Sequence, residues 1–317
     1  MATGASNCDL AVVLIDARHG VITQTKRHSF IVSLLGIRHV VVAINKMDLM
    51  DWSPAVYASI RREYSDFVAR LDFADIHFIP MSALLGDNVV EPSAHMPWYK
   101  GPSLLHHLEN VSIVTDRNLI DMRFPVQYVV RPNLDFRGFA GTVASGVVRA
   151  GDEVMALPSR QVSRVREIVT YDGAVDHAFP PMAVVVTLAD EIDVSRGSML
   201  VHVNNVPTVS SEVEAMLVWM SETPVREGAA FLVKHTTNLV PGTLSQIRYR
   251  VDVNTMRKAS EGNEAGKARH LALNEIARVH LTLHRPVAFD PYRRNRQPGA
   301  FLSSEERRVG KERRSRS

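Results

Sequence analysis

The feature that most constrains the fold is a change of hydrophobic pattern near Arg123. Before this residue, short apolar runs alternate with stretches of helical spacing. After it, the chain consists of short apolar runs separated by turn dipeptides such as Gly151-Asp152 and Asp172-Gly173. Alternating strands and helices are typical of a parallel sheet, and closely spaced short strands are typical of barrels. The sequence therefore predicts an α/β fold followed by all-β structure, with a partial doubly wound domain and two small β-barrels.

The spacing of apolar residues places the individual elements of the first part. Apolar runs predict strands at 10–15, 40–44 and 76–79, and helical spacing predicts helices at 24–35, from Pro54 onward and at 102–108. Ser53 is suited to cap the second helix because its hydroxyl can accept from a free backbone N–H in the first turn. Strand, crossover helix and strand together form the βαβ unit of a parallel sheet.

The all-β part is predicted to contain two sets of strands that meet near Pro207. The first set includes 126–130, 142–148, 153–157, 162–170 and 184–188, and the second includes 214–220, 231–235, 247–253 and 277–283. We expect the α/β domain at 1–113, a linker at 114–122, one barrel at 123–207, another at 208–302 with an incomplete last strand, and a tail at 303–317.

Composition excludes several classes of protein. With 45% hydrophobic and 22% charged residues, the chain has enough apolar surface to form packed domains. No apolar run approaches the roughly 20 residues that a membrane span needs, so no membrane contact is expected. The single cysteine, Cys8, excludes a disulfide framework and a thiolate metal cluster and favours a cytoplasmic location.

The formal net charge of +3 comes entirely from the tail. Without the six basic and three acidic residues of 303–317, the rest of the chain holds 31 of each sign, so no nucleic-acid partner is expected. The tail lacks apolar periodicity and resembles translated sequencing-adapter read-through, which predicts a non-native segment. A genuine basic arm for RNA and a solvated tail are the alternatives.

The sharpest motif is the run Asn45-Lys46-Met47-Asp48, which directly follows the apolar run 40–44. Ligands of doubly wound folds bind at this carboxyl edge of the sheet. A carboxylate there can accept from both the N1–H and the exocyclic amine of guanine, a donor pair that adenine lacks. Asn45 can contact the base edge and join neighbouring loops, while the stem of Lys46 can lie over the ring. Asp48 would then select guanine.

A second loop strengthens this interpretation, because Met81-Ser82-Ala83-Leu84 follows the next predicted strand. A short Ser82 and a small Ala83 would let a backbone N–H approach the guanine O6. The alternative is a plain turn at the end of a strand with Asp48 as a cap. Two such loops at one sheet edge favour a guanine site formed by Asn45, Lys46, Asp48, Ser82, Ala83 and Leu84.

With these motifs, the chain up to about Phe301 resembles translational GTPases of the elongation factor Tu type. Within that superfamily it is most similar to the GTP-binding subunits of bacterial sulfate adenylyltransferases. The stretches that carry the resemblance are 36–48, 96–102, 131–139 and 190–197. Asn45, Lys46 and Asp48 match the family's guanine-specificity motif, and Ser82 with Ala83 match its second base loop.

The resemblance implies a GTPase, a nucleotidyltransferase subunit that couples GTP hydrolysis to the synthesis of adenosine 5′-phosphosulfate from ATP and sulfate. That reaction belongs to sulfate assimilation and cysteine biosynthesis. The family also implies a smaller catalytic adenylyltransferase subunit in a heterodimer, and GTP and Mg²⁺ as ligands. A translational GTPase that binds aminoacyl-tRNA is the alternative, because both groups share the base loops.

The sequence departs from the family at the phosphate site. It has no G-x-x-x-x-G-K-[S/T] loop and no Asp-x-x-Gly switch motif. The run 262–268 is superficially similar, but its glycines are too close and Ala268 replaces the hydroxyl that binds Mg²⁺. Asp16 is interpreted as a strand-end residue. We therefore expect a fragment that lacks the Mg²⁺ ligands and cannot hydrolyse GTP alone.

Overall fold

A computed structural model describes residues 8–112, 118–133, 136–259 and 270–305 of the chain. The chain forms two compact units, and each is described by itself. The first comprises Met1–Asp116 and Val251–Ala259, and the second comprises Arg117–Arg250 and Ser260–Ser317. No helix in the described part is long and apolar enough to cross a membrane. The greater part of the predicted tail, 306–317, lies outside the described residues, as does the whole run at 262–268 that is superficially similar to a phosphate loop.

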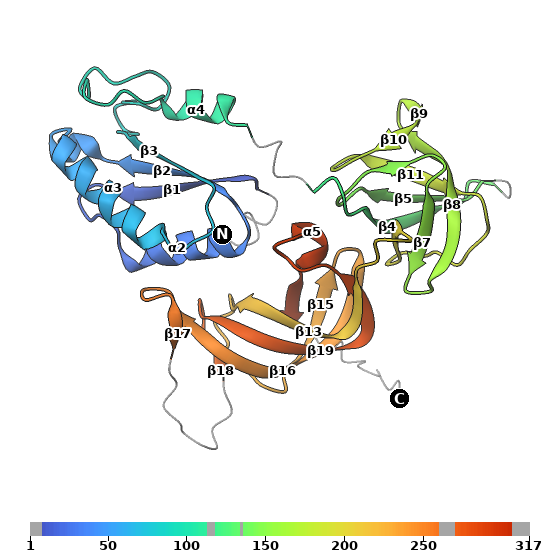
Figure 1. Ribbon diagram of the computed structural model, residues 1–317. Coiled ribbons are helices and arrows are strands. Elements are labelled where there is room, and N and C mark those ends of the chain that lie inside the picture. Colours follow the sequence, from blue (N-terminus) through green and yellow to red (C-terminus); the bar gives the residue numbers. More distant parts are fainter. Residues whose placement is uncertain (1–7, 113–117, 134–135, 260–269, 306–317) are drawn as a thin grey trace, which may run out of the picture. The chain divides into compact units, whose positions relative to one another are not determined.

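The first unit is built on a three-stranded parallel sheet in the order β1-β2-β3 (Figure 1). Its strands are β1 (Leu10–Asp16), β2 (His39–Asn45) and β3 (Asp75–Pro80). The central strand β2 is buried from Val40 to Ile44, as expected for a strand with both faces covered. The three predicted strands are therefore confirmed, with bounds shifted by one or two residues at most.

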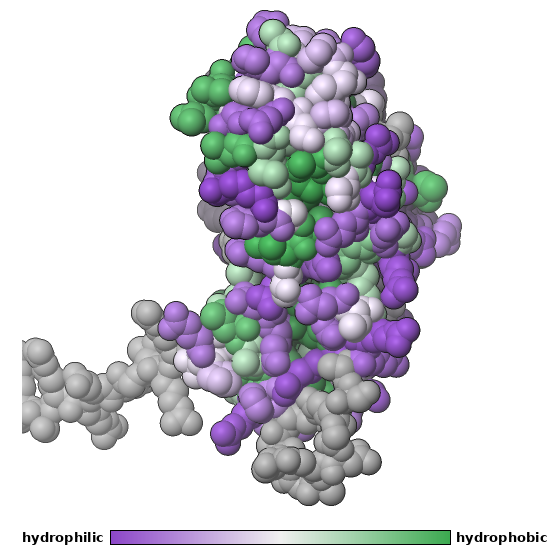
Figure 2. Space-filling model, turned by 90° about the vertical axis from the view of Figure 1, so that its left-hand side faces the viewer, coloured by the Kyte–Doolittle hydropathy of each residue, from purple (hydrophilic) through white to green (hydrophobic). Residues whose placement is uncertain are grey.

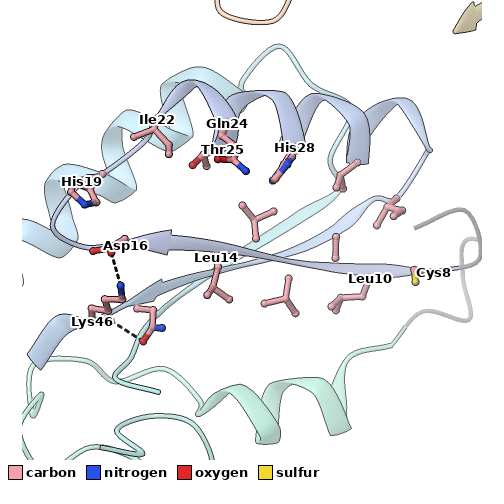
Figure 3. Close-up of a pocket in the computed structure, with 17 residues that line it drawn as sticks. Cys8, Leu10, Leu14, Asp16, His19, Ile22, Gln24, Thr25, His28 and Lys46 are labelled. Atoms are coloured by element: carbon pink, nitrogen blue, oxygen red, sulfur yellow. Dashed lines mark hydrogen bonds and ion pairs between the residues drawn. The ribbon is translucent and has the colours of Figure 1, made fainter. Parts of the chain in front are cut away.

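Helices cover both faces of this sheet. They are α2 (Thr23–Leu34), α3 (Pro54–Val68) and α4 (Leu104–Asn110), and a short 3₁₀ helix η1 (Met47–Met50) follows β2. On one face, Ile60, Tyr64 and Val68 of α3 join Val32 of α2 in the core against the strands. α4 lies on the opposite face (Figures 1 and 3).

Local signals explain where two of these helices begin and end. Ser53 caps α3, because its Oγ accepts from the Val56 N–H at 3.4 Å, and Pro54 occupies the first turn. Gly36, with φ +64°, follows the end of α2 in the left-handed conformation that glycine adopts without strain. The predictions from the helix start and stop signals are confirmed here.

The second unit contains a closed barrel formed by residues after Arg123. Its seven-stranded path runs β11-β5-β4-β12-β7-β8-β9, and an additional β11–β8 pairing closes the ring. Its interior is apolar, with Phe124, Phe139 and Ile168 in the core. The strands of this part are β4 (Arg123–Val130), β5 (Gly138–Thr142), β6 (Val148–Arg149), β7 (Glu153–Leu157), β8 (Gln161–Thr170), β9 (Gly173–Val175), β10 (His177–Ala178), β11 (Ala183–Leu188) and β12 (Met199–His202).

One predicted strand is wrong. The run 142–148 was expected to be continuous, but β5 ends at Thr142 and β6 begins only at Val148. Gly146 interrupts it with φ +69°, and a Cβ there would lie 2.3 Å from the backbone of Met122. The chain turns at this point because glycine allows a close backbone approach that apolar periodicity does not reveal.

Six of the remaining strands form a sheet whose main path is β13-β19-β16-β15-β20, with β17 paired to β16, while β14 and β18 pair with each other in a separate two-stranded sheet. Leu244, Ile247 and Val279 are fully buried in its core. The elements are β13 (Thr208–Val218), β14 (Val225–Arg226), β15 (Ala230–His235), β16 (Asn238–Asp252), β17 (Arg257–Ala259), β18 (His270–Leu271), β19 (Ile276–Phe289), α5 (Arg296–Gly299) and β20 (Leu302–Glu305). The pairing of β20 with β15 continues to Glu305, so residues 303–305 of the segment predicted as a tail belong to a strand. The predicted domain boundaries stay predictions.

A buried ion pair joins the two strand systems of the second unit. The five guanidinium N–H groups of Arg123 donate to Asp290, to Asn205 and to the Met122 carbonyl. The Arg123 and Asp290 side chains are 1% and 4% exposed. This arrangement uses every donor of a buried arginine, which is the condition for such a pair to be tolerated in a protein interior.

Figure 2 shows one face of the molecule, where hydrophilic and hydrophobic residues are interspersed. This mixture is usual for a folded protein, because apolar atoms contribute more than half of an ordinary protein surface. Isolated exposed apolar residues therefore carry no functional argument by themselves.

Candidate guanine-binding site

The carboxyl ends of the three parallel strands bring the predicted base loops to one edge of the sheet. Asp16 ends β1 and Asn45 ends β2, and they are register partners. The ladder between β2 and β3 continues past the strand ends, where Met81 N donates to the Ile44 carbonyl at 2.8 Å. The sheet edge is therefore the framework on which both loops are positioned.

Asn45 joins the two loops directly. Its side-chain Oδ1 accepts from the backbone N–H of Lys46 at 2.8 Å and from that of Ala83 at 2.9 Å. A second link is a backbone hydrogen bond of 3.2 Å from Met47 N to the Met81 carbonyl. The loop-joining role predicted for Asn45 is thus present, and its amide NH₂ is the group that would donate to a base.

Asp48 lies in η1, one residue after the fully buried Met47. Lys46 precedes η1 with φ +65°, and this left-handed residue turns the chain sharply after β2. Burial of Met47 fixes the start of η1 against the core, while the Asp48 side chain is only half-buried. The carboxylate is therefore held on a fixed turn next to the loop that begins at Met81.

The ammonium group of Lys46 is bound to Asp16 rather than left in solvent (Figure 3). Lys46 Nζ donates to Asp16 Oδ2 at 2.9 Å, and Arg18 donates to both oxygens of Asp16 at 3.0 and 2.7 Å. The Arg18 hydrogen bond and that of Lys46 hold the pKa of Asp16 well below its usual range. Asp16 is thus a strand-end carboxylate that anchors the Lys46 side chain.

The second base loop is a tight turn. Ser82 is fully buried and pairs with Asp87 through Ser82 N and the Asp87 carbonyl at 3.2 Å. Its Oγ accepts from Leu85 N at 3.3 Å. The Ala83 N–H is used by Asn45, which leaves the Leu84 N–H as the next donor along the turn, below a side chain that is 86% exposed. The tip of the turn at Leu84 is thus exposed to solvent.

Sequence reasoning missed a polar cluster behind this loop. The Asp87 carboxylate, which is 8% exposed, accepts from the Trp52 indole at 3.0 Å and from Ser93 Oγ at 2.6 Å. His95 Nδ1 lies 3.1 Å from the same carboxylate. Burial alone would raise the pKa of Asp87, but hydrogen bonds from Ser93, His95 and Trp52 outweigh it and lower the pKa. In the sequence, only the short distance between Ser82 and Asp87 could have suggested that Asp87 belongs to this turn.

A pocket of about 820 Å³ opens along β1 and reaches Lys46 and Asn45 (Figure 3). Within the described chain, β1 pairs only with β2, and its Val12 and Leu14 side chains are 41% and 62% exposed. No group of three or more His, Cys, Asp and Glu side chains in the described residues is placed to hold a metal ion. Asp16 is already bound by two cations, so the residues described here do not fit a Mg²⁺ site.

Two family models match the chain. The elongation factor Tu GTP-binding domain matches residues 1–136, and the GTP-eEF1A C-terminal domain-like family matches residues 212–309. The first match spans β1 to β3 and both base loops, and the second spans the six-stranded sheet. The two matches agree with the change from α/β to all-β structure.

Curated relatives are similar over 95% of this chain. The bifunctional enzyme CysN/CysC of Rhodopirellula baltica is 57% identical, and the chain covers 46% of it. Sulfate adenylyltransferase subunit 1 of Bacteroides fragilis and of Bacteroides thetaiotaomicron are each 56% identical, with 62% and 63% covered. The chain thus spans between about half and three fifths of the length of these relatives.

Solved structures show the same fold at low sequence identity. The crystal structures of sup35 complexed with GMPPNP and with GDP are each 22% identical, with TM-scores of 0.53 and 0.55. The similarity covers 96% of this chain in both cases and 76% and 78% of those chains. At this identity the solved structures support the fold alone. In sequence, the chain is similar over 95% of its length to sulfate adenylyltransferase subunit 1 of two Bacteroides species, and parts of it match the elongation factor Tu GTP-binding domain and the GTP-eEF1A C-terminal domain-like family.

Proposed function

We propose that the chain supplies the guanine-recognition part of a GTPase subunit of sulfate adenylyltransferase. The whole subunit would couple GTP hydrolysis to the formation of adenosine 5′-phosphosulfate from ATP and sulfate. The observation that carries the proposal is the pair of hydrogen bonds at Asn45 Oδ1, which holds the Asp48 loop beside the Ser82 loop. The names of the curated relatives support the reaction.

In this proposal each residue of the site has a defined task. The Asp48 carboxylate accepts from the N1–H and the 2-amine of guanine, and the Asn45 amide donates to the base edge. The backbone of the turn at Ser82, Ala83 and Leu84 faces the O6 of guanine. The ion pair between Lys46 and Asp16 keeps the lysine stem across the sheet edge, where it can cover one side of the ring.

The phosphate groups need residues beyond those described. GTP hydrolysis depends on positioning the γ-phosphate and stabilising its charge, usually with a phosphate loop and Mg²⁺. Within the described residues β1 is an edge strand with exposed Val12 and Leu14 side chains, and a further strand of the same subunit would pair with it. We propose that the phosphate-binding groups belong to that part of the full-length subunit.

The proposed partner is a smaller adenylyltransferase subunit, as the words "subunit 1" in the names of relatives imply. The alternative, a translation factor that carries aminoacyl-tRNA, has less support, because relatives at 52–56% identity are named sulfate adenylyltransferase subunit 1. Co-purification separates the two: an adenylyltransferase subunit supports the proposal, and bound tRNA supports the alternative.

Base selectivity tests the site directly. The 317-residue chain would be titrated with GMP, AMP and XMP and followed by the backbone amide resonances of the two loops. We expect GMP to bind better than AMP by roughly tenfold or more, since two charge-assisted hydrogen bonds are lost with adenine. Asp48→Asn should reverse the order of GMP and XMP, because the amide donates where xanthine carries an oxygen.

Asp51→Asn is the matched control for this experiment. Asp51 lies directly after η1, is exposed and has φ +48°, a conformation that asparagine adopts readily. This substitution removes one carboxylate from the same turn and should leave the preference for GMP unchanged. Equal binding of GMP and AMP by the parent chain, or an unchanged preference in Asp48→Asn, would overturn the proposal.

A further inference from the structure

Asp87 is a buried carboxylate that the proposed contacts to guanine do not use. It lies at the end of the Ser82 turn, and its backbone carbonyl accepts from Ser82 N. The next residue, Asn88, fixes the turn to β3 through a 2.8 Å hydrogen bond from its Nδ2 to the Pro80 carbonyl. The backbone of Asp87 is thus part of the second base loop, and its position is set by the end of β3.

The side chain of Asp87 points to the other base loop. Its Oδ2 accepts from the Trp52 indole at 3.0 Å, and Trp52 is the residue that ends the turn containing Asp48. The backbone N–H of Trp52 donates to the Met47 carbonyl at 2.9 Å and so closes that turn. One carboxylate therefore joins the far end of the Asp48 turn to the far end of the Ser82 turn.

The surroundings keep the Trp52 ring in this orientation. His95 stacks on it, with ring centroids 4.4 Å apart and planes 21° apart. The Trp52 carbonyl accepts from the Trp98 indole at 3.1 Å. Trp52 is thus held from the ring face, from its backbone and at the indole nitrogen, so the bond to Asp87 acts between two well-positioned groups.

We propose that Asp87 is a positioning residue for guanine recognition: through Trp52 it sets the place of Asp48 relative to the Ser82 turn. Asn45 links the near ends of the two loops, and Asp87 links their far ends. With both links, the Asp48 carboxylate can meet the N1–H and the 2-amine together. This inference rests on the proposed function, since it assumes that Asp48 contacts the base.

The test uses a pair of ligands that report on one hydrogen bond of Asp48. GMP and IMP differ only in the 2-amino group, so the ratio of their dissociation constants measures how well Asp48 reaches that amine. In the 317-residue chain we expect GMP to bind roughly tenfold or more tightly than IMP. Trp52→Phe keeps an aromatic ring on His95 but removes the donor to Asp87, and it should reduce the preference to about threefold or less.

Ser93→Ala is the matched control. It removes a different hydrogen bond to the same carboxylate, from a residue outside both base loops. A loss of general stability would lower the binding of GMP and IMP equally and leave their ratio unchanged, so Ser93→Ala should retain the preference of the parent chain. The Trp52 indole proton resonance shows whether the Asp87 contact is kept in each variant.

A second variant makes the result independent of the tryptophan. Asp87→Ala leaves no side-chain acceptor for the Trp52 indole, and it should lower the ratio as Trp52→Phe does. The double variant should show no further loss, because both substitutions break one link. If the parent chain prefers GMP to IMP and both single variants keep that preference, the inference fails while the proposed function stands. If the parent chain binds GMP and IMP equally well, the inference and the proposed function both fail.

Discussion

The side chain of Asn45 accepts a hydrogen bond of 2.9 Å from the backbone N–H of Ala83, a residue 38 positions further along the chain. The two residues belong to loops that follow neighbouring parallel strands. The side-chain oxygen of Asn45 therefore links the two loops, as backbone hydrogen bonds link the two strands. This link holds the two loops of the predicted guanine site together.

Removal of this link should loosen the second loop. In Asn45→Ala we expect faster hydrogen exchange at the Ala83 amide and a loss of unfolding free energy of about 1–2 kcal/mol, as for one part-buried hydrogen-bond acceptor. Exchange followed by NMR and chemical denaturation measure the two effects. Asn110→Ala removes an exposed side-chain bond in α4 and should leave Ala83 exchange unchanged. Unaltered exchange at Ala83 in Asn45→Ala would contradict the role given to Asn45.

The 317-residue chain should not turn over GTP in the presence of Mg²⁺. Phosphoryl transfer needs groups that position the γ-phosphate, and the sequence holds no G-x-x-x-x-G-K-[S/T] run to provide them. Release of radiolabelled phosphate from GTP is the measurement. The Asp48→Ala variant identifies contaminating activity, which would persist in it. Magnesium-dependent turnover that Asp48→Ala abolishes would refute the expectation.

Stability of the second unit should fall in acid because of Asp121. The Arg294 guanidinium, with Asn118 and Asn205, holds the pKa of this buried carboxyl well below its usual range. A depressed pKa stabilises the fold above the unfolded value near 4, and that contribution is lost as pH falls from there towards the folded value. Denaturant unfolding between pH 6 and 2 measures the effect. Asp121→Asn and Arg294→Gln should both make the free energy of unfolding depend less on pH. An unchanged pH dependence in these variants would argue against a stabilising ion pair between Asp121 and Arg294.

Breaking the buried pair of Arg123 and Asp290 should cost about 3–5 kcal/mol, because Arg123→Met leaves an uncompensated carboxylate in the interior. Arg123→Lys should also destabilise the fold, because an ammonium group cannot replace five donors in a planar fork. Adding Asp290→Asn to Arg123→Met should recover part of the loss. Chemical denaturation followed by circular dichroism tests the series. A single Arg123→Met variant as stable as the parent would exclude this account.

Several elements were predictable because short-range patterns determine them. β1 and β2 contain continuous apolar runs, β3 is a short apolar run interrupted by His77, and Ser53 with Pro54 marks the start of α3. The place of Asn45 at the end of β2 follows from the same runs, since a parallel sheet collects its loops at one edge. The strand expected at 142–148 failed because Gly146 makes a backbone contact with Met122 that no local pattern records.

The sequence by itself determined the change from α/β to all-β structure and the two motifs at the sheet edge, because hydrophobic period and residue type are local properties. Only the tertiary structure decided which groups join those motifs. The bonds from Asp87 to Trp52 and from Lys46 to Asp16 connect residues 35 and 30 positions apart. Such pairings depend on how the strands and turns pack in three dimensions, and neither member of either pair carries a signal of its partner.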